Sequence, residues 1–166
     1  MLNLSITITV LFFAFVILTI YLGIKVVPQS KVFIVERFGK YHKTLNAGLS
    51  IIVPYLDKVQ YRVLILERQL EEFKISVITK DNVEVTLEST VFYRVIDAAK
   101  SVYRIKNLNS AINTAATSIV RSAAGRLELD ELQSSRDAMN VEIAKNLQEA
   151  AKIWGIEVTR TETVSY

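Results

Sequence analysis

Cysteine is absent from this chain of 166 residues, histidine occurs once, and the few glycines are scattered. The lack of cysteine excludes disulfides, thiolate metal sites and cysteine nucleophiles together. The single histidine, His42, cannot build a histidine-rich metal centre, and in a basic turn it is expected to be a surface residue. No glycine-rich phosphate loop and no G-x-S-x-G nucleophile turn occurs. The residue types that most often carry catalysis or hold a cofactor are therefore scarce.

Charge is missing from the amino-terminal segment, since no residue from Met1 to Ile24 has a charged side chain. At about 1.5 Å per residue, a helix over Leu4–Ile24 would be about 30 Å long, which matches the hydrocarbon core of a bilayer. Its few Ser and Thr hydroxyls can bond to nearby backbone carbonyls, so lipid tolerates them. Residues 1–24 are therefore predicted to be a transmembrane anchor. Its membrane-facing residues are Leu4, Ile6, Ile8, Val10, Leu11, Phe12, Phe13, Phe15, Val16, Ile17, Leu18, Ile20, Tyr21 and Leu22.

Two other interpretations of this segment are weaker. A cleaved signal peptide would have a basic start and a small-x-small cleavage site, and the sequence has neither. A core helix of a soluble domain would have a polar face, which the run lacks. An uncleaved anchor remains the favoured interpretation.

Positive charge begins directly after the anchor. The basic residues there are Lys25, Lys31, Arg37, Lys40 and Lys43. Because basic flanks stay on the cytoplasmic side, we expect the N-terminus outside and the following domain in the cytoplasm, at the inner cell membrane. These cations would attract anionic headgroups by about 1 kcal/mol each near the surface, although each one alone also fits a solvated face. The net charge of +3 is too small to indicate a nucleic-acid partner.

Alternating patterns predict strands in the first half of the chain. Lys31–Phe38 is rich in β-branched and aromatic residues, and Val59–Phe73 predicts one or two further strands. Beyond a turn at 80–82, apolar and polar residues alternate from Val83 to Val95, with Phe92 as an apolar exception on the polar face. This pattern is typical of a sheet with one buried and one wetted face.

Helical periodicity follows in the second half. Asp97 and Asn107 are expected helix N-caps, and an apolar stripe of period 3.6 runs from there to Leu127. A third helix is predicted to start at a capping box, Ser134-x-x-Asp137, and to end at Gly155. Its predicted inner face consists of Met139, Ile143, Leu147, Ala150 and Trp154.

A closing strand is predicted over Ile156–Val164, so the fold class is α+β, an anchor helix followed by an antiparallel-rich sheet packed with helices. The soluble domain is expected over 25–166, with a strand-rich part over about 25–95 and a helix-rich part over about 96–166.

Acidic runs are the remaining candidates for chemistry. They are Glu67, Glu71 and Glu72, and Glu128, Asp130 and Glu131. Such runs are more often solvated faces or salt-bridge partners than catalytic carboxylates. A Ser–Lys nucleophile pair stays open, because both residues are plentiful and nothing marks one pair out. The expectation is no catalytic residue, no metal and no cofactor.

Several stretches stand in a fixed order after the anchor. They are KVVPQSKVFIVERFGKYHKTLNAGLSIIVPYLDKV, VITKDNVEVTLESTVFYRVIDAAKSVY, LELDELQSSRDAMN and WGIEVTR. In this order they resemble the stomatin–prohibitin–flotillin–HflK/C group, the SPFH or Band 7 proteins, and within it the stomatin-like (paraslipin, QmcA-type) branch. The resemblance covers about Lys25 to Thr161.

This resemblance implies a membrane-anchored scaffold and not an enzyme. Members assemble into large homo-oligomeric rings or cages, organise lipid microdomains and regulate membrane proteases, and an NfeD-type membrane protein is a common partner. Members usually continue into a long Ala/Glu-rich helix after the closing strand. This sequence stops at Tyr166, so a fragment or a truncated member is expected.

The resemblance further implies that the early part of the domain skims the bilayer, at Gly48–Leu56. The residues agree, because this stretch is too short to span and Pro54 disfavours a central strand. The alternative is that Ile51 and Val53 simply pack in the domain core. The expected membrane-surface residues are Leu49, Ile51, Ile52, Val53, Pro54, Tyr55 and Leu56, together with the basic residues named above.

Self-association is expected to use outward strand residues and the third helix, with Phe92 and Arg136 as candidate oligomer contacts. Two function hypotheses from other classes remain beside the scaffold. One is a monomeric lipid- or peptide-binding recruitment module at the membrane surface, and the other is a membrane hydrolase with a Ser–Lys site.

Overall fold

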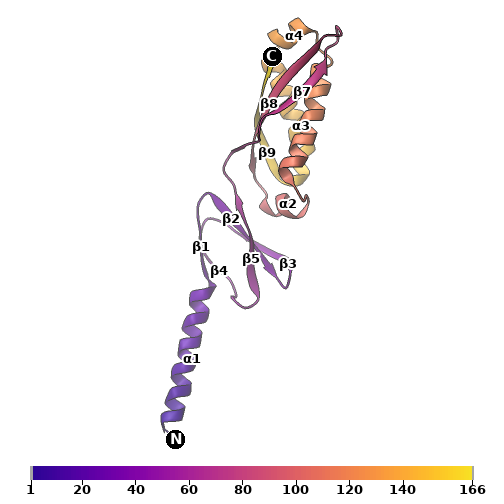
Figure 1. Cartoon of the computed structure of the whole chain (residues 1–166). Helices are drawn as coiled ribbons and strands as arrows, with labels where there is room; N and C mark the ends of the chain where they lie inside the picture. Colours follow the sequence, from indigo (N-terminus) through magenta and orange to yellow (C-terminus); the bar gives the residue numbers. More distant parts are fainter. Residues whose placement is uncertain (1, 166) are drawn as a thin grey trace. The chain divides into compact units, whose positions relative to one another are not determined.

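The computed structural model describes residues 2–165 and divides the chain into two compact units, one up to Leu64 and one from Ile65. Unit 1 contains α1 and β1–β5, and unit 2 contains β6–β9, α2–α5 and the short 3-10 helix η1 (Figure 1). The sequence pattern changes from strand-like to helical near Val95, but the boundary between the compact units lies earlier, after Leu64. The reason is that β8 pairs both with β7, which precedes it, and with β9, which follows the helices, so that all three strands belong to unit 2. The fold is α+β, as predicted.

The amino-terminal rod of unit 1 is α1 (Leu2–Gly23). Its described part Asn3–Gly23 has a mean hydropathy of 2.5 and is long and apolar enough to cross a membrane. Threonine hydroxyls donate to the backbone carbonyls four residues earlier at 2.7–2.9 Å, as expected for polar residues in an apolar helix. These residues are Thr7, Thr9 and Thr19.

The rest of unit 1 consists of two small antiparallel sheets. One pairs β1 (Ile24–Val27) with β4 (Gly48–Ile51). The other has the order β3 (Lys40–Leu45), β2 (Lys31–Arg37), β5 (Asp57–Leu64). Between them lies a small core of Val27, Phe33, Val35, Leu45 and Ile52, with Val59 packed against it.

Unit 2 is built on one antiparallel sheet with β8 (Glu84–Val95) at its centre. Two strands, β6 (Arg68–Gln69) and β7 (Phe73–Ile78), pair with different parts of β8, and β9 (Ile156–Ser165) also pairs with it. The predicted alternation is confirmed from Val85 onward, because the buried side chains are Val85, Leu87, Ser89, Val91, Tyr93 and Val95, joined by Thr90. Val83, where the predicted alternation starts, is exposed and precedes β8.

Helices cover this sheet, with α3 and α5 lying side by side (Figure 1). The helices are α2 (Ala98–Tyr103), α3 (Leu108–Ala124), α4 (Leu129–Ser134), α5 (Arg136–Ala151) and η1 (Lys152–Trp154). Both predicted N-caps are confirmed, since Asp97 accepts from the Lys100 amide at 3.2 Å and Asn107 from the Ser110 amide at 3.1 Å. Gly155 follows η1 at φ +67°, a left-handed conformation that favours glycine.

Two details of the third predicted helix are wrong. The capping box lies at Glu128 and Glu131, and it opens a separate short helix, α4. Ser134 lies at the end of α4, where its hydroxyl donates to the Asp130 carbonyl at 2.8 Å. The inner face of α5 ends with Ala151 in place of Ala150, because the buried residues are spaced by four.

Candidate membrane-contact surface

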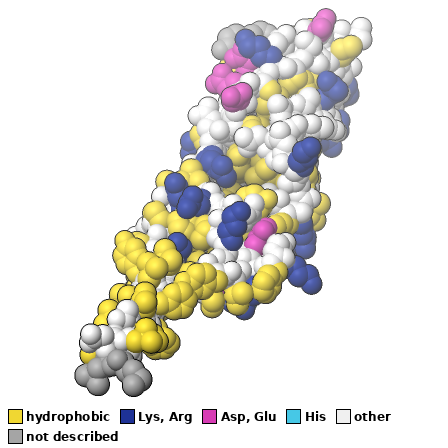
Figure 2. All heavy atoms as spheres, turned by 60° about the horizontal axis from the view of Figure 1, so that its bottom comes forward, with side chains coloured by type: hydrophobic (Ala, Val, Ile, Leu, Met, Phe, Trp, Pro, Cys, Tyr) yellow, Lys and Arg dark blue, Asp and Glu magenta, His cyan; other side chains and the backbone are white. Residues whose placement is uncertain are grey.

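The first part of the surface is an apolar face on the β1–β4 ribbon. Alternate residues of a strand share a face, and the register pairs Ile24 with Ile51 and Val26 with Leu49. Three of these side chains are 70–72% exposed, and Ile24 is 39% exposed. Figure 2 shows apolar side chains over much of its foreground. Apolar surface of this kind marks a site that contacts lipid or another protein.

The loop that follows, residues 52–56, divides between the core and the surface. Val53, Tyr55 and Leu56 are exposed, and Pro54 is half-buried. Ile52 is only 5% exposed and belongs to the small core of unit 1. The expectation that Ile52 contacts the membrane is therefore wrong, because its side chain points inward between the two sheets. The alternative of core packing fails for Ile51 and Val53, which stay exposed.

This loop is attached to the last turns of α1. The Tyr55 ring stacks on Phe15, with centroids 6.0 Å apart and an interplanar angle of 6°, and its hydroxyl lies 3.2 Å from the Thr19 hydroxyl. The Ile52 amide donates to the Gly23 carbonyl at 2.8 Å. A Cβ at Gly23 would lie 2.7 Å from the Ile52 carbonyl oxygen, so this approach requires glycine. These contacts therefore hold the loop against the helix.

An ion pair holds the other end of the loop. The Arg37 Nε donates to Asp57 Oδ1 at 2.6 Å and its Nη2 to Oδ2 at 3.1 Å, while the Val53 amide also donates to Oδ2 at 3.1 Å. These donors, the Arg37 guanidinium first, lower the pKa of Asp57 to about 2 against the opposing effect of its burial. The Arg37 guanidinium is therefore engaged by Asp57 within the protein. This ion pair limits the contact with lipid headgroups that is expected of Arg37.

The other predicted basic residues have different surroundings. Lys43 donates to the Ile51 carbonyl at 3.0 Å and so links β3 to β4. Lys40 is exposed, and Lys31 is half-buried. Lys25 is half-buried and lines a cavity with residues of β5. Among the described residues, Lys25, Lys31 and Lys40 form no ion pair, so their charges are available to an external anion.

Sequence reasoning missed part of the apolar face. Ile24 falls at the end of the predicted anchor, and Val26 lies in the short stretch Lys25–Pro28, where no periodicity shows. Their exposure side by side with Leu49 and Ile51 depends on the pairing of two strands far apart in sequence. Phe38, 82% exposed in the β2–β3 turn at φ +52°, was also missed, although an aromatic residue before Gly39 in a turn is a visible signal.

The two candidate oligomer contacts lie in unit 2. Phe92 is half-buried, and the Arg160 guanidinium lies 4.2 Å from its ring centroid. Arg136 is half-buried at the start of α5, where its Nη2 donates to the Ser165 hydroxyl at 3.2 Å. Both side chains thus have partners within the unit, and the structure does not bring them together.

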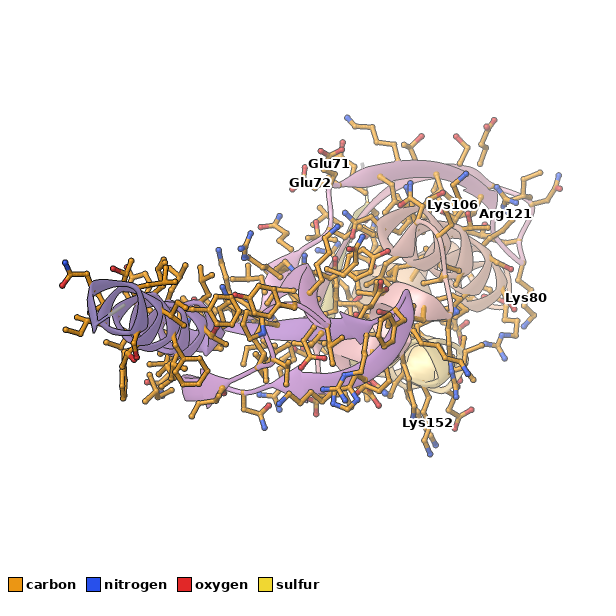
Figure 3. The ribbon with its side chains drawn as sticks, turned by 90° about the horizontal axis from the view of Figure 1, so that it is seen from below. Glu71, Glu72, Lys80, Lys106, Arg121 and Lys152 are labelled. Atoms are coloured by element: carbon orange, nitrogen blue, oxygen red, sulfur yellow. The ribbon has the colours of Figure 1, made fainter. Side chains whose placement is uncertain are left out.

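Acidic and basic side chains of unit 2 mostly point outward. Figure 3 labels Glu71, Glu72, Lys80, Lys106, Arg121 and Lys152, which extend from the body in different directions. Within residues 2–165 no group of His, Asp and Glu has a metal-binding arrangement. His42 is exposed, as expected for a surface residue. The Glu67–Glu71–Glu72 and Glu128–Asp130–Glu131 runs are exposed too, and Glu128 pairs with Lys80.

These features define an α+β domain that carries a membrane-spanning type of helix and an exposed apolar surface beside it. Comparison with known proteins agrees: the model of the SPFH domain / Band 7 family matches residues 25–165. The chain therefore belongs to the SPFH domain / Band 7 family, and the predicted family is confirmed.

Similar proteins come from distant organisms. The chain is 36% identical over 139 residues to an "Uncharacterized protein" of Schizosaccharomyces pombe. The aligned residues make up 84% of this chain and 39% of the yeast protein. It is 32% identical over 136 residues to human "Stomatin-like protein 2, mitochondrial", covering 82% of the chain and 38% of the human protein. It is also 30% identical over 148 residues to an "Uncharacterized protein" of Mycobacterium tuberculosis, covering 89% of the chain and 39% of that protein. The chain thus spans about 39% of the length of these relatives, and the similarity to a stomatin-like protein supports membrane association.

Proposed function

We propose that the protein is a membrane-anchored scaffold subunit, held to the bilayer by α1 and by the apolar face of the β1–β4 ribbon. The observation that carries this proposal is the attachment of the partly exposed 52–56 loop to the last turns of α1 through Tyr55, Phe15 and Gly23. A helix that crosses the bilayer would carry this loop and the adjoining apolar face into the membrane interface with it.

The depth of the loop follows from helix geometry. Phe15 lies eight residues before Gly23, which corresponds to about 12 Å along the axis of α1. The whole of α1 is about 33 Å long, close to the thickness of the hydrocarbon core plus a short margin. If α1 spans the bilayer, the Tyr55 ring that stacks on Phe15 lies below the headgroups. Val53 and Leu56 of the same loop are suited to that environment because both are apolar.

The basic residues after α1 give the orientation we propose, with the N-terminus outside and residues 25–166 in the cytoplasm at the inner cell membrane. Unit 2 then supplies self-association, for which the outward strand residue Phe92 and the α5 residue Arg136 remain the candidates. Regulation of a membrane protease and contact with an NfeD-type membrane protein complete the proposal, and both rest on the family alone. We propose no enzymatic activity.

Membrane contact can be tested on the full chain, because the absence of cysteine allows single-cysteine labelling without further changes. Leu49→Cys, labelled with an environment-sensitive fluorophore in vesicles, should show a blue-shifted emission and strong quenching by lipids with a headgroup-proximal quencher. The matched control is Val141→Cys, which labels an equally exposed apolar position, 69% against 71%, on α5 of unit 2.

Three results would contradict membrane contact, the anchor and the orientation in turn. Equal quenching of both labels would show that Leu49 has no special contact with lipid. Extraction of the intact chain by alkaline carbonate would exclude a spanning α1. Labelling of Lys40→Cys by an impermeant maleimide only from the outside of intact cells would reverse the orientation.

Self-association separates the scaffold from a monomeric recruitment module at the membrane surface. Mass photometry of the detergent-purified chain should show assemblies larger than a monomer, and their share should grow with concentration. A single monomer peak at every concentration would favour the recruitment module instead.

A further inference from the structure

A cavity of about 320 Å³ lies in unit 1, where the end of α1 meets the 52–56 loop and β5. Its size falls in the lower part of the range, ~300–1,000 Å³, found for small-molecule sites. Apolar side chains form most of its wall: Leu22, Phe33, Ile52, Pro54, Tyr55 and Val59. Three basic side chains, Lys25, Lys58 and Arg62, complete the lining together with Asp57.

The charge balance of this cavity favours an anion. Among the described residues that line it, Asp57 is the one acidic residue; the Arg37 guanidinium already bonds to both of its oxygens, and the Val53 amide bonds to Oδ2. Within the part of the chain that the structure describes, neither Lys25 nor Lys58 forms an ion pair. Arg62 lies over the Phe33 ring, 5.4 Å from its centroid, which orients the guanidinium without neutralising it. The three cations are therefore free to bind an anion.

The position of the cavity relates it to the bilayer surface. Leu22 lies in the last turn of α1, and Tyr55 and Pro54 belong to the loop attached to that helix. An occupant of this cavity would contact cations of β1 and β5 and, beside them, apolar side chains of α1, the loop, β2 and β5. A phospholipid has this arrangement, with a phosphate at the surface and a glycerol and acyl region below it.

We propose that this cavity binds the phosphate headgroup of an anionic phospholipid such as phosphatidylglycerol, and this inference rests on the membrane attachment proposed above. Lys58 and Arg62 of β5 and Lys25 of β1 contact the phosphate, and Phe33 and Val59 contact the glycerol region. Phosphatidylcholine fits less well, because its quaternary ammonium would meet three cations and an Asp57 that is already paired. The headgroup thereby fixes the orientation of unit 1 against the bilayer.

The test measures lipid retention on the full-length protein in neutral detergent by native mass spectrometry, with phosphatidylglycerol and phosphatidylcholine as probes. We expect one phosphatidylglycerol to be retained in preference to phosphatidylcholine. Lys58→Gln should weaken this preference roughly fivefold, and the double variant Lys58→Gln/Arg62→Gln should weaken it roughly thirtyfold. These factors correspond to a loss of about 1 kcal/mol of binding free energy for each cation removed. Lys58→Arg keeps the charge and should keep the preference.

The matched control is Lys106→Gln with Lys152→Gln, which removes the same charge from exposed positions of unit 2. If this control weakens retention as much as the β5 variant, the binding is a general charge effect and the cavity is not the site. Lys58 is exposed and forms no ion pair within residues 2–165, so Lys58→Gln should fold normally, which circular dichroism checks.

Three further results separate the possible failures. Glycerol phosphate that binds as tightly as the lipid would overturn the assignment to a membrane lipid in favour of a soluble phosphate. No preference for phosphatidylglycerol in a protein that resists carbonate extraction would overturn the cavity inference and leave the proposed function standing. A protein that carbonate washes off vesicles would overturn both, since the cavity would no longer lie at a bilayer.

Discussion

The two units of this chain use apolar side chains in opposite ways. Unit 2 packs them between one sheet and the helices that cover it, in a cluster that includes Leu87 of β8, Val120 of α3 and Ile143 of α5. Unit 1 has a much smaller core, and it leaves Val26, Leu49 and other apolar side chains exposed. The difference indicates that unit 2 is stabilised by its own interior, whereas unit 1 is completed by a partner surface, for which we propose the bilayer.

The ion pairs of the two units also differ, in how far they are exposed to solvent. In unit 1, Asp57 is nearly inaccessible and receives three hydrogen bonds. In unit 2, the pair of Arg94 with Glu157 lies on the surface, with side chains 54% and 43% exposed. A small core needs polar contacts to define its geometry, while a large core can leave its ion pairs in solvent, where they contribute little.

The largest effect should come from the core of unit 2. Leu87→Ala removes a fully buried side chain from the central strand and should lower the free energy of unfolding by about 3 kcal/mol. Urea unfolding in detergent, followed by the fluorescence of Trp154, measures this, because the only tryptophan of the chain lies in unit 2.

The control for this change is Ile96→Ala in the same unit, where the side chain is 65% exposed. It should change the free energy of unfolding by no more than about 0.5 kcal/mol. If both variants lost the same stability, the claim that unit 2 depends on its interior would be wrong.

A smaller effect, confined to unit 1, is expected from Asp57→Asn. The amide keeps the shape of the carboxyl but leaves the Arg37 guanidinium without its counter-charge, so unit 1 should open more often. Hydrogen–deuterium exchange of peptides from β2 and β5 should become roughly tenfold faster, allowing for the partial exposure of Arg37. Peptides from β8 should keep their protection, because the pair makes no contribution to unit 2.

The pH dependence of this effect has a defined sign. The pKa of Asp57 in the folded protein, about 2, lies below its usual value near 4. Its stabilising contribution is therefore complete above about pH 4 and is lost as the pH falls toward 2. The exchange difference between Asp57→Asn and the natural chain should shrink over that interval, and a constant difference would exclude the carboxylate as its source.

Local patterns in the sequence predict much of unit 2. The alternation of Val85, Leu87 and Val91 along β8 and the side chains of Asp97 and Asn107 determine strand faces and helix starts within a few residues. The misplaced capping box shows the limit of such patterns. Ser134-x-x-Asp137 and Glu128-x-x-Glu131 both fit the spacing, and the backbone folds around the second.

The candidate site was predictable only in part, because it depends on contacts between distant residues. An apolar segment around Pro54 is visible in the sequence, but the outward position of Ile51 depends on its pairing with β1, and Ile52 turns inward where its amide donates to the Gly23 carbonyl. The stacking of Tyr55 on Phe15 and the close approach at Gly23 join segments about 30 to 40 residues apart. The hydrophobic periodicity of the sequence does not predict such contacts.

The smallest effect should come from Arg94→Gln on the surface of unit 2. This change removes the ion pair with Glu157, yet both side chains are about half exposed, so water replaces most of what is lost. The free energy of unfolding reported by Trp154 should change by at most about 0.5 kcal/mol, and less in high salt. The comparison with Asp57→Asn is informative because each variant removes one partner of an arginine–carboxylate pair in an antiparallel sheet. If Arg94→Gln opened unit 2 as much as Asp57→Asn opens unit 1, burial would not explain the difference between the two pairs, and unit 1 would no longer be distinguished by its dependence on polar contacts.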